Sequence, residues 1–206
     1  MFQRALLFTG GRSPTLDFDR SQIPPCSLVY AADSGIDTAL ALGYTIDEAI
    51  GDFDSISGLE ILHGITHTRL PEEKDVTDTE AMLIHMHKQG ISEYVLIGGG
   101  EGRFDHLIHL YALFGRYGPP VQWITAREHL FLVRDALTLS TTPYAPLSII
   151  PAITQGKSVV HSTHLYWELL DYPISMEQHS ISNKSTESSC GITVSGDPVF
   201  VSIPFP

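Results

Sequence analysis

The feature that most constrains the fold is an alternation that repeats through the first 125 residues. A short apolar run is followed by a polar turn and then by a helical stretch, several times in succession. Because parallel strands need long crossover connections, this βα rhythm predicts a mainly parallel sheet. Strands are expected at Arg4–Thr9, Ser27–Ala32, Glu48–Gly51, Ile65–Arg69, Glu93–Ile97 and Val121–Thr125, and helices at Ile36–Leu42, Thr79–Gln89 and His106–Arg116. The sequence therefore predicts an α/β N-terminal domain with a Rossmann-like sheet.

After Gly118, Pro119 and Pro120 the pattern changes to short strand-like runs between Ser, Thr, Gly and Pro residues. Charged residues also thin out, with 11 in residues 124–206 against 25 in residues 1–123. The pattern is typical of antiparallel sheets and predicts an all-β C-terminal sandwich. We place the two domains at 1–123 and 124–206, and interpret Ser182–Ser189 as a flexible loop. The remaining strands are expected at Leu130–Arg134, Leu137–Ser140, Ser148–Ile150, Ser158–His161, Gly191–Val194 and Val199–Ile203.

The charge balance narrows the class of ligand. Twenty-four acidic residues against 12 basic ones give a net charge of −12. A chain this acidic lacks the basic surface of a protein that binds nucleic acid or an anionic membrane, so we expect neither partner. We also expect a bound phosphate to arrive with a metal ion. No segment approaches the ~18 apolar residues of a membrane span. Only Cys26 and Cys190 are present, which favours a cytoplasmic location.

Polar residues that directly follow the expected strands are the candidate site, because ligands of open α/β sheets bind beyond the carboxyl ends of the strands. Carboxylates two residues apart, such as Asp52 and Asp54, can converge on one Mg²⁺ ion. Taken alone the pair also fits ordinary turn capping. The accumulation of carboxylates favours a metal, since unpaired charges ~5 Å apart repel by roughly 3 kcal/mol at a dielectric of 20. The aspartates at this edge are Asp33, Asp52, Asp54, Asp75, Asp78 and Asp105.

The N-terminal ends of two expected helices add candidate residues to the same edge of the sheet. Lys74, Asp75 and Asp78 precede an apolar helix and suit a metal–phosphate site, although Thr77 and Glu80 also fit a capping box. Residues 98–106, Gly-Gly-Gly-Glu-Gly-Arg-Phe-Asp-His, lack the common nucleotide fingerprints. Their glycines, a helix N-terminus and an arginine can still bind an anion, and a plain tight turn is the alternative.

The sequence does not indicate a catalytic site in which a histidine activates a nucleophile. The Gly-x-Ser-x-Gly pattern is absent, and the spaced histidine pairs, among them His106 and His109, lack the i, i+4 spacing of a helical zinc site. We interpret most of the histidines as core or surface residues, and we set His106 apart because it follows Asp105.

Four segments in this order resemble the thiamine pyrophosphokinase family. They are Ala-Asp-Ser-Gly at 32–35, Gly-Asp-Phe-Asp-Ser at 51–55, Lys-Asp-Val-Thr-Asp at 74–78 and Gly-Arg-Phe-Asp-His at 102–106, and Ile-Ser-Asn at 181–183 is similar to the family's thiamine-side motif. The resemblance implies an α/β nucleotide domain, a β-sandwich, and a homodimer with thiamine pockets at the subunit interface. It also implies Mg²⁺-dependent transfer of pyrophosphate from ATP to thiamine, giving thiamine diphosphate and AMP.

The resemblance also implies roles for individual residues. The metal residues would be Asp52, Asp54 and Asp78, and the catalytic edge would add Arg103 and Asp105. Thiamine would be bound by Ser182 and Asn183. The nucleotide would be bound by Asp33, Ser34, Gly35, Lys74, Asp75, Thr77, Gly102 and Arg103. The alternatives are a Mg²⁺- or Mn²⁺-dependent nucleotidyl- or glycosyltransferase and a non-catalytic nucleotide or thiamine sensor.

Overall fold

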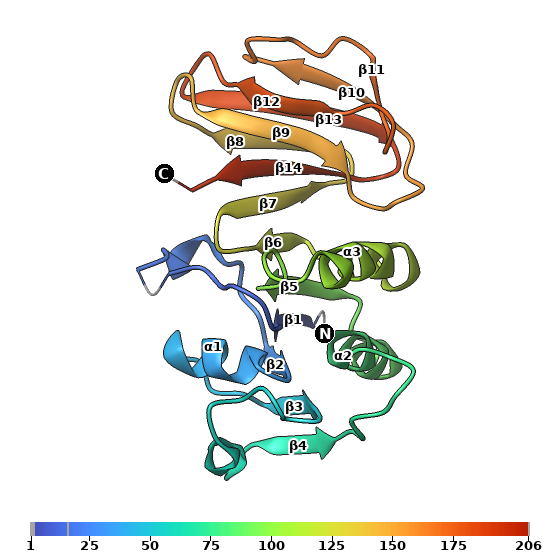
Figure 1. The fold of residues 1–206 in the computed structure, drawn as a ribbon. Coiled ribbons are helices and arrows are strands. Elements are labelled where there is room, and N and C mark those ends of the chain that lie inside the picture. Colours follow the sequence, from blue (N-terminus) through green and yellow to red (C-terminus); the bar gives the residue numbers. More distant parts are fainter. Residues whose placement is uncertain (1–2, 16, 206) are drawn as a thin grey trace. The chain divides into compact units, whose positions relative to one another are not determined.

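A computed structural model describes residues 3–15 and 17–205 of the chain (Figure 1). The contacts between Cα atoms divide the chain into two compact units. The first comprises Met1–Leu113 and Pro120–Arg127, and the second comprises Phe114–Pro119 and Glu128–Pro206. The two units are described in turn.

The first unit is built on a six-stranded sheet in which every pairing is parallel. Its strands follow the order β6-β5-β1-β2-β3-β4. Strands β1 and β5 are buried along nearly their whole length, as expected where both faces of a parallel sheet are covered. The strands are β1 (Arg4–Phe8), β2 (Leu28–Ala32), β3 (Glu48–Gly51), β4 (Thr66–Arg69), β5 (Glu93–Ile97) and β6 (Gln122–Ile124).

Three α-helices follow strands of this sheet. Helix α1 (Gly35–Ala41) contacts β1 and β2, and α2 (Asp78–Lys88) contacts β2 and β3. Helix α3 (Phe104–Tyr117) begins seven residues after β5 ends. Two short 3₁₀ turns, Arg20–Gln22 and Leu59–Leu62, lie in the connections. The βα alternation expected from the sequence is therefore present.

The second unit contains two antiparallel sheets, with strand orders β12-β9-β14-β7 and β11-β10-β13-β8. Alternate residues of β10 are buried, and the buried residues of both sheets contribute to one apolar cluster. The β-rich C-terminal part is thus confirmed. Its strands are β7 (Glu128–Val133), β8 (Ala136–Ser140), β9 (Pro146–Pro151), β10 (Ser158–Thr163), β11 (Tyr172–Ile174), β12 (Ser180–Lys184), β13 (Ser189–Gly196) and β14 (Val199–Pro204).

The expectation of a flexible loop at Ser182–Ser189 is wrong. Residues up to Lys184 belong to β12, which pairs with β9, and β13 begins at Ser189. The segment escaped detection because its buried residues are polar: Asn183 is 1% exposed and Ser185 is fully buried. A periodicity of apolar residues cannot reveal a strand whose inward positions are Asn and Ser. Strand β11 is short and was not expected either.

No helix in the described part of the chain is long and apolar enough to cross a membrane. Both cysteines are free thiols, with Cys190 buried and Cys26 partly buried.

Candidate active site

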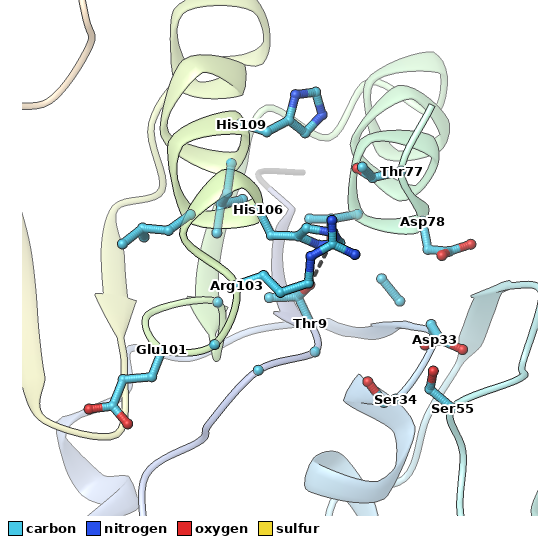
Figure 2. Close-up of a pocket in the computed structure, with 18 of the residues that line it drawn as sticks. Thr9, Asp33, Ser34, Ser55, Thr77, Asp78, Glu101, Arg103, His106 and His109 are labelled. Carbon is cyan, nitrogen blue, oxygen red and sulfur yellow. Dashed lines mark hydrogen bonds between the residues drawn. The ribbon is translucent and has the colours of Figure 1, made fainter. Parts of the chain in front are cut away.

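A pocket lies where the strand order of the first unit reverses. Strand β1 pairs with β2 on one side and β5 on the other, so the connections leave it in opposite directions, which opens a crevice beyond the carboxyl ends of the strands. A cavity of about 270 Å³ occupies this position. Its lining comes from Thr9, Gly10, Gly11, Ala32, Asp33, Ser34, Ser55, Thr77, Asp78, Thr79, Gly99, Glu101, Gly102, Arg103, His106, Leu107, His109, Leu110 and Leu113 (Figure 2).

Two glycine-rich loops form one wall of the pocket. The loop after β1 and the loop after β5 are joined by a hydrogen bond from the Gly99 amide to the Gly10 carbonyl, 2.9 Å long. The backbones lie so close that a β-carbon on Gly98 would be 2.4 Å from the carbonyl oxygen of Thr9, and Gly98 also has a φ of +98°. These positions therefore require glycine. The second loop was expected from the sequence, whereas the first was not, although Gly10 and Gly11 directly follow an apolar run.

The opposite side of the pocket carries carboxylates. One oxygen each of Asp33, Asp52 and Asp54 lie within 4.8 Å of one another. Burial raises the pKa of Asp33, and the negative charges of Asp78, Asp52 and Asp54 raise it further, against a hydrogen bond from the Ser34 amide. Oxygen Oδ1 of Asp33 is buried without a hydrogen-bond partner among the described residues. Asp33 thus lies in the acidic cluster that was expected at this edge, whereas the family resemblance implied a nucleotide-binding role for it.

The positions of Asp52 and Asp54 follow from the residue between them. Phe53 is 3% exposed, has a φ of +61°, and places its ring edge-on to His67. This buried ring anchors the turn and leaves the two flanking carboxylates at the end of β3. The amide of Asp54 donates to Asp52 Oδ1 at 3.4 Å, so the turn-capping interpretation of this pair also describes a contact that exists. Turn geometry and a shared cation are compatible here.

Lys74 connects the acidic cluster to helix α2. Its Nζ lies 2.5 Å from Asp52 Oδ2 and 3.1 Å from Asp78 Oδ1. The hydrogen bond from Lys74 lowers the pKa of Asp52. Burial raises the pKa of Asp78, and Lys74 only partly offsets it. Asp78 therefore holds a proton more readily than Asp52 does. Asp75 is exposed and lies outside the cluster.

The first turn of helix α2 lies beside the pocket and has a capping residue, Thr77, and a buried acidic residue, Glu80. The Thr77 hydroxyl accepts a hydrogen bond from the Glu80 amide at 3.2 Å, as the capping interpretation expected. The hydroxyls of Thr79 and Thr9 are 2.5 Å apart, which links this helix to the loop after β1. The Glu80 side chain is only 4% exposed, and its Oε2 lies 3.3 Å from His109 Nε2 on helix α3.

Arginines gather on the glycine-loop side. Arg103 and Asp105 form a bidentate pair, with Nη2 to Oδ2 at 2.5 Å and Nε to Oδ1 at 3.2 Å, and both side chains are well exposed. This pairing raises the pKa of Arg103 and lowers that of Asp105. Glu101 forms ion pairs with Arg127 and with Arg12. Figure 2 shows Glu101 on one side of the pocket and Asp33 on the other, with Arg103 and His106 between them.

Ser182 and Asn183 lie in the second unit, on β12. Asn183 is buried, and its side-chain amide donates to the Trp167 carbonyl at 2.8 Å and accepts from the Trp167 amide at 3.2 Å. Ser182 is exposed, has a φ of +57°, and its amide donates to the Ser148 hydroxyl. The side-chain amide of Asn183 is therefore hydrogen-bonded within the unit, whereas Ser182 is exposed at the surface.

Residues 20–117 match the family model "Thiamin pyrophosphokinase, catalytic domain", and no curated protein matches the chain. Solved structures of three thiamine pyrophosphokinases are similar. The Bacillus subtilis protein has a TM-score of 0.76 at 19% identity, covering 99% of this chain and 100% of that one. The Geobacillus thermodenitrificans protein has a TM-score of 0.73 at 21% identity, covering 99% and 98%.

The third is the Candida albicans protein, with a TM-score of 0.71 at 18% identity, covering 100% of this chain and 90% of that one. At these identities the likeness establishes the fold over nearly the whole chain. The family model matches the segment that carries α1, α2, the acidic cluster, Lys74 and the loop after β5. Residues 20–117 are therefore similar to a thiamin pyrophosphokinase catalytic domain, and the fold of nearly the whole chain is that of the solved thiamine pyrophosphokinases.

Proposed function

We propose that this chain transfers pyrophosphate from ATP to the hydroxyl group of thiamine, giving thiamine diphosphate and AMP. The observation that carries the proposal is the composition of the pocket. Glycines of two loops and the carboxylates of Asp33 and Asp78 line one cavity, and all of these residues except those of the loop after β1 lie in the segment that matches the catalytic domain. A metal-bound polyphosphate needs both kinds of partner, since its oxygens accept from amides and its cation binds carboxylates.

The nucleotide is assigned to the glycine-loop side. The strand order, with β1 between β2 and β5, supports a Rossmann-like nucleotide site at the reversal point. Gly10, Gly11 and Gly99 present backbone close to the cavity, and α3 begins nearby with the positive end of its dipole. Arg103 is exposed at the cavity and has the planar donor fork that suits phosphate oxygens. Ser34, Gly35 and Gly102 complete the nucleotide assignment.

Magnesium is assigned to the acidic side. Three carboxylate oxygens within 4.8 Å form the oxygen-only donor set that a hard cation prefers, and the unpartnered Asp33 Oδ1 fits a missing positive charge. We therefore propose Asp33, Asp52 and Asp54 as the ligands, with Asp78 acting beside them through Lys74. When bound, the ion would neutralise negative charge on the phosphate oxygens.

In this reaction the protein mainly positions the two substrates and neutralises negative charge on the phosphates. The thiamine oxygen forms a bond to the β-phosphorus, the bond between that phosphorus and the oxygen bridging to the α-phosphate breaks, and AMP leaves with that oxygen. We assign acceptance of the hydroxyl proton to Asp78, because a carboxylate with a raised pKa is the better base. Lys74 holds Asp78 Oδ1, which leaves Oδ2 for the hydroxyl. Arg103 and Lys74 offset charge developing on the phosphates.

The thiamine side is assigned to the second unit, with Ser182 as the contacting residue and Asn183 as the residue that holds the strand. A homodimer is proposed with the β-rich unit supplying much of the contact. Large apolar side chains exposed on that unit support this, since free apolar surface favours association. They include Tyr144, Val159, Tyr166, Trp167, Leu170, Met176 and Ile181. A cytoplasmic location is retained because both cysteines are free thiols.

One assay tests the proposed function. The purified protein is incubated with ATP, Mg²⁺ and thiamine, and AMP and thiamine diphosphate are quantified together. Equimolar formation of both products supports the proposal. Formation of a nucleotidylated or glycosylated product would indicate the other transferase class. Binding of ATP or thiamine without turnover would indicate a sensor, and either result would overturn the assignment.

A further inference from the structure

Two threonine hydroxyls meet at the pocket, and no step proposed above uses them. Thr9 directly follows β1, and Thr79 is the second residue of α2, directly after Asp78. Their Oγ1 atoms lie 2.5 Å apart, and both residues line the cavity. At this separation one hydroxyl donates to the other. The contact therefore ties the first turn of α2 to the end of β1, the strand between β2 and β5.

The position of Thr9 is fixed by its backbone and by its methyl group. Its amide donates to the Ile97 carbonyl at 2.9 Å, and a β-carbon on Gly98 would lie 2.4 Å from its carbonyl oxygen. Its Cγ2 atom lies 3.2 Å from where a β-carbon on Gly99 would stand, and the residue is 4% exposed. Thr9 is thus packed against the glycine-rich loop after β5, and its hydroxyl reaches across to α2.

Thr79 belongs to a helix that packs elsewhere on the sheet. Helix α2 contacts β2 and β3, whereas the glycine-rich loops of the pocket follow β1 and β5. Thr79 is bonded in the chain to Asp78, whose Oδ1 lies 3.1 Å from Lys74 Nζ. A shift of the first turn of α2 would therefore move Asp78 relative to the loops. The Thr9–Thr79 contact connects the element that carries this carboxylate to the element that carries the glycines.

A second hydroxyl contact on the same helix provides a comparison. At the other end of α2, the Tyr30 hydroxyl donates to Oε1 of Gln89, the C-cap residue, at 2.7 Å. Tyr30 lies on β2, and both residues are outside the lining of the pocket. This contact attaches α2 to the sheet away from the site. The contact at the first turn differs because both of its residues line the cavity and one of them adjoins Asp78.

We propose that Thr9 and Thr79 are positioning residues, whose paired hydroxyls hold Asp78 at a fixed distance from the glycine-rich loops. The inference rests on the proposed function, because it takes Asp78 as the acceptor of the thiamine hydroxyl proton and the loops as the nucleotide side. Proton transfer needs donor and acceptor atoms about 2.6–3.2 Å apart. A displacement of ~1 Å can lower a rate by about a hundredfold. Loosening the first turn of α2 should therefore slow the reaction while the nucleotide still binds.

Steady-state kinetics with ATP, Mg²⁺ and thiamine tests this role on variants that keep the shape of the side chain. Thr9→Val and Thr79→Val each remove one hydroxyl, and we expect each to lower kcat about tenfold and to change the KM for ATP less than twofold. The double variant should lose no more than either single variant, since the two hydroxyls form one contact. Thr9→Ser keeps the hydroxyl, so its kcat should stay within twofold of the wild type.

Tyr30→Phe is the matched control, and urea unfolding is measured on the same proteins. This variant loses the hydroxyl contact at the other end of α2, so it should lower the urea midpoint and leave kcat within twofold of the wild type. The double valine variant leaves neither hydroxyl unpaired. Its urea midpoint should therefore be no lower than that of either single variant, while its kcat stays reduced.

Four results with an active wild-type protein would overturn the proposal. Unchanged kcat in the valine variants would make the pair structural only. A raised KM for ATP at unchanged kcat would show that the hydroxyls contact the nucleotide themselves. Additive losses in the double variant would show that the two hydroxyls act independently. A tenfold lower kcat in Thr9→Ser or Tyr30→Phe would assign the effect to the Thr9 methyl group or to the general attachment of α2.

The wild-type protein distinguishes this failure from a failure of the proposed function. If it forms neither AMP nor thiamine diphosphate, the proposed function is wrong and the positioning role is overturned with it. If it forms both products and the variants behave in one of the four ways above, the positioning role alone is wrong.

Discussion

Gly51 lies against Asp33 so closely that a β-carbon on the glycine would stand 3.0 Å from the aspartate Cα. Gly51 is the last residue of β3 and Asp33 directly follows β2, and the two strands are neighbours, with Ala32 paired to Ile50. The Asp33 amide also donates to the Ile50 carbonyl at 3.0 Å. The acidic cluster therefore depends on a glycine that carries no functional group itself.

Replacing this glycine should displace Asp33 from the cluster. We expect Gly51→Ala to lower kcat/KM at least tenfold, because a shift of a few tenths of an ångström alters how three carboxylates converge. Steady-state kinetics at several Mg²⁺ concentrations measures it. Gly115→Ala is the control, because its β-carbon would meet only the Thr154 hydroxyl at 3.9 Å. Wild-type kinetics in Gly51→Ala would show that the cluster adapts.

Asp33→Asn should stabilise the metal-free protein while impairing catalysis. The pKa of Asp33 is raised by burial and by neighbouring carboxylates, so the folded state binds this proton more tightly than the unfolded chain. The ionised group consequently destabilises the fold above its folded pKa, and stability falls as the pH rises through the interval between the two pKa values. At neutral pH the neutral amide removes that cost.

Thermal unfolding with and without Mg²⁺ tests this. The wild-type Tm should rise on adding the ion, the metal-free Tm of Asp33→Asn should exceed that of the wild type, and the variant should gain little from Mg²⁺. Asp75→Asn, an exposed aspartate outside the cluster, should behave as the wild type does. A lower metal-free Tm in Asp33→Asn would contradict the electrostatic argument.

His129 should make the second unit sensitive to acid. It lies on β7, is 2% exposed, and burial lowers its pKa from 6.5 to about 4. The unfolded chain therefore takes up this proton between those values while the folded state does not, so stability decreases as the pH falls from about 6.5 towards 4. The full effect is on the order of 3 kcal/mol.

Urea unfolding at pH 7 and pH 5 measures that sensitivity. The loss of stability between the two values should be smaller in His129→Gln than in the wild type. His161→Gln replaces an exposed histidine of the same unit and should leave the loss unchanged. The comparison uses differences between pH values within each variant, so a lower overall stability of His129→Gln does not affect the result. Equal losses in all three proteins would refute the assignment.

Ser182→Ala should impair thiamine binding, whereas Asn183→Ala should lower the stability of the fold. Asn183 is buried with its amide bonded to the Trp167 backbone, so its removal leaves buried polar groups unpaired and should cost about 1–3 kcal/mol of stability. Ser182→Ala should keep the stability and raise the KM for thiamine, with little change for ATP. Urea unfolding measures the stability of both variants, and steady-state kinetics measures their KM for thiamine and for ATP. A thiamine KM unchanged in Ser182→Ala would remove that residue from the acceptor site.

Continuous apolar runs carried most of the fold prediction. Strands such as Arg4–Phe8 and Glu93–Ile97 are buried on both faces and are bounded by turn residues, so local sequence is enough to find them. Strand β12 was missed because its register depends on the bulged pairing with β9 and on buried polar side chains. Such pairing is a property of the folded partner and leaves no local pattern.

Residues within one loop motif could be found from the sequence, whereas pairings between motifs could not. Asp52 and Asp54 were visible because they flank one turn. The closeness of Asp33 to both requires the parallel register of β2 and β3. Likewise, the contact of Glu80 with His109 joins two helices separated by a strand in the chain, and no spacing within either helix encodes it.

The wall of the pocket made by Gly10, Gly11 and Gly99 has a consequence for how such proteins diverge. A surface made of peptide groups keeps the same shape whatever the neighbouring residues become, provided the glycines persist. Substitution can therefore accumulate elsewhere in the domain without altering what this wall presents. That tolerance offers a physical reason why a fold can be shared at 17–21% identity by chains from bacteria and yeasts.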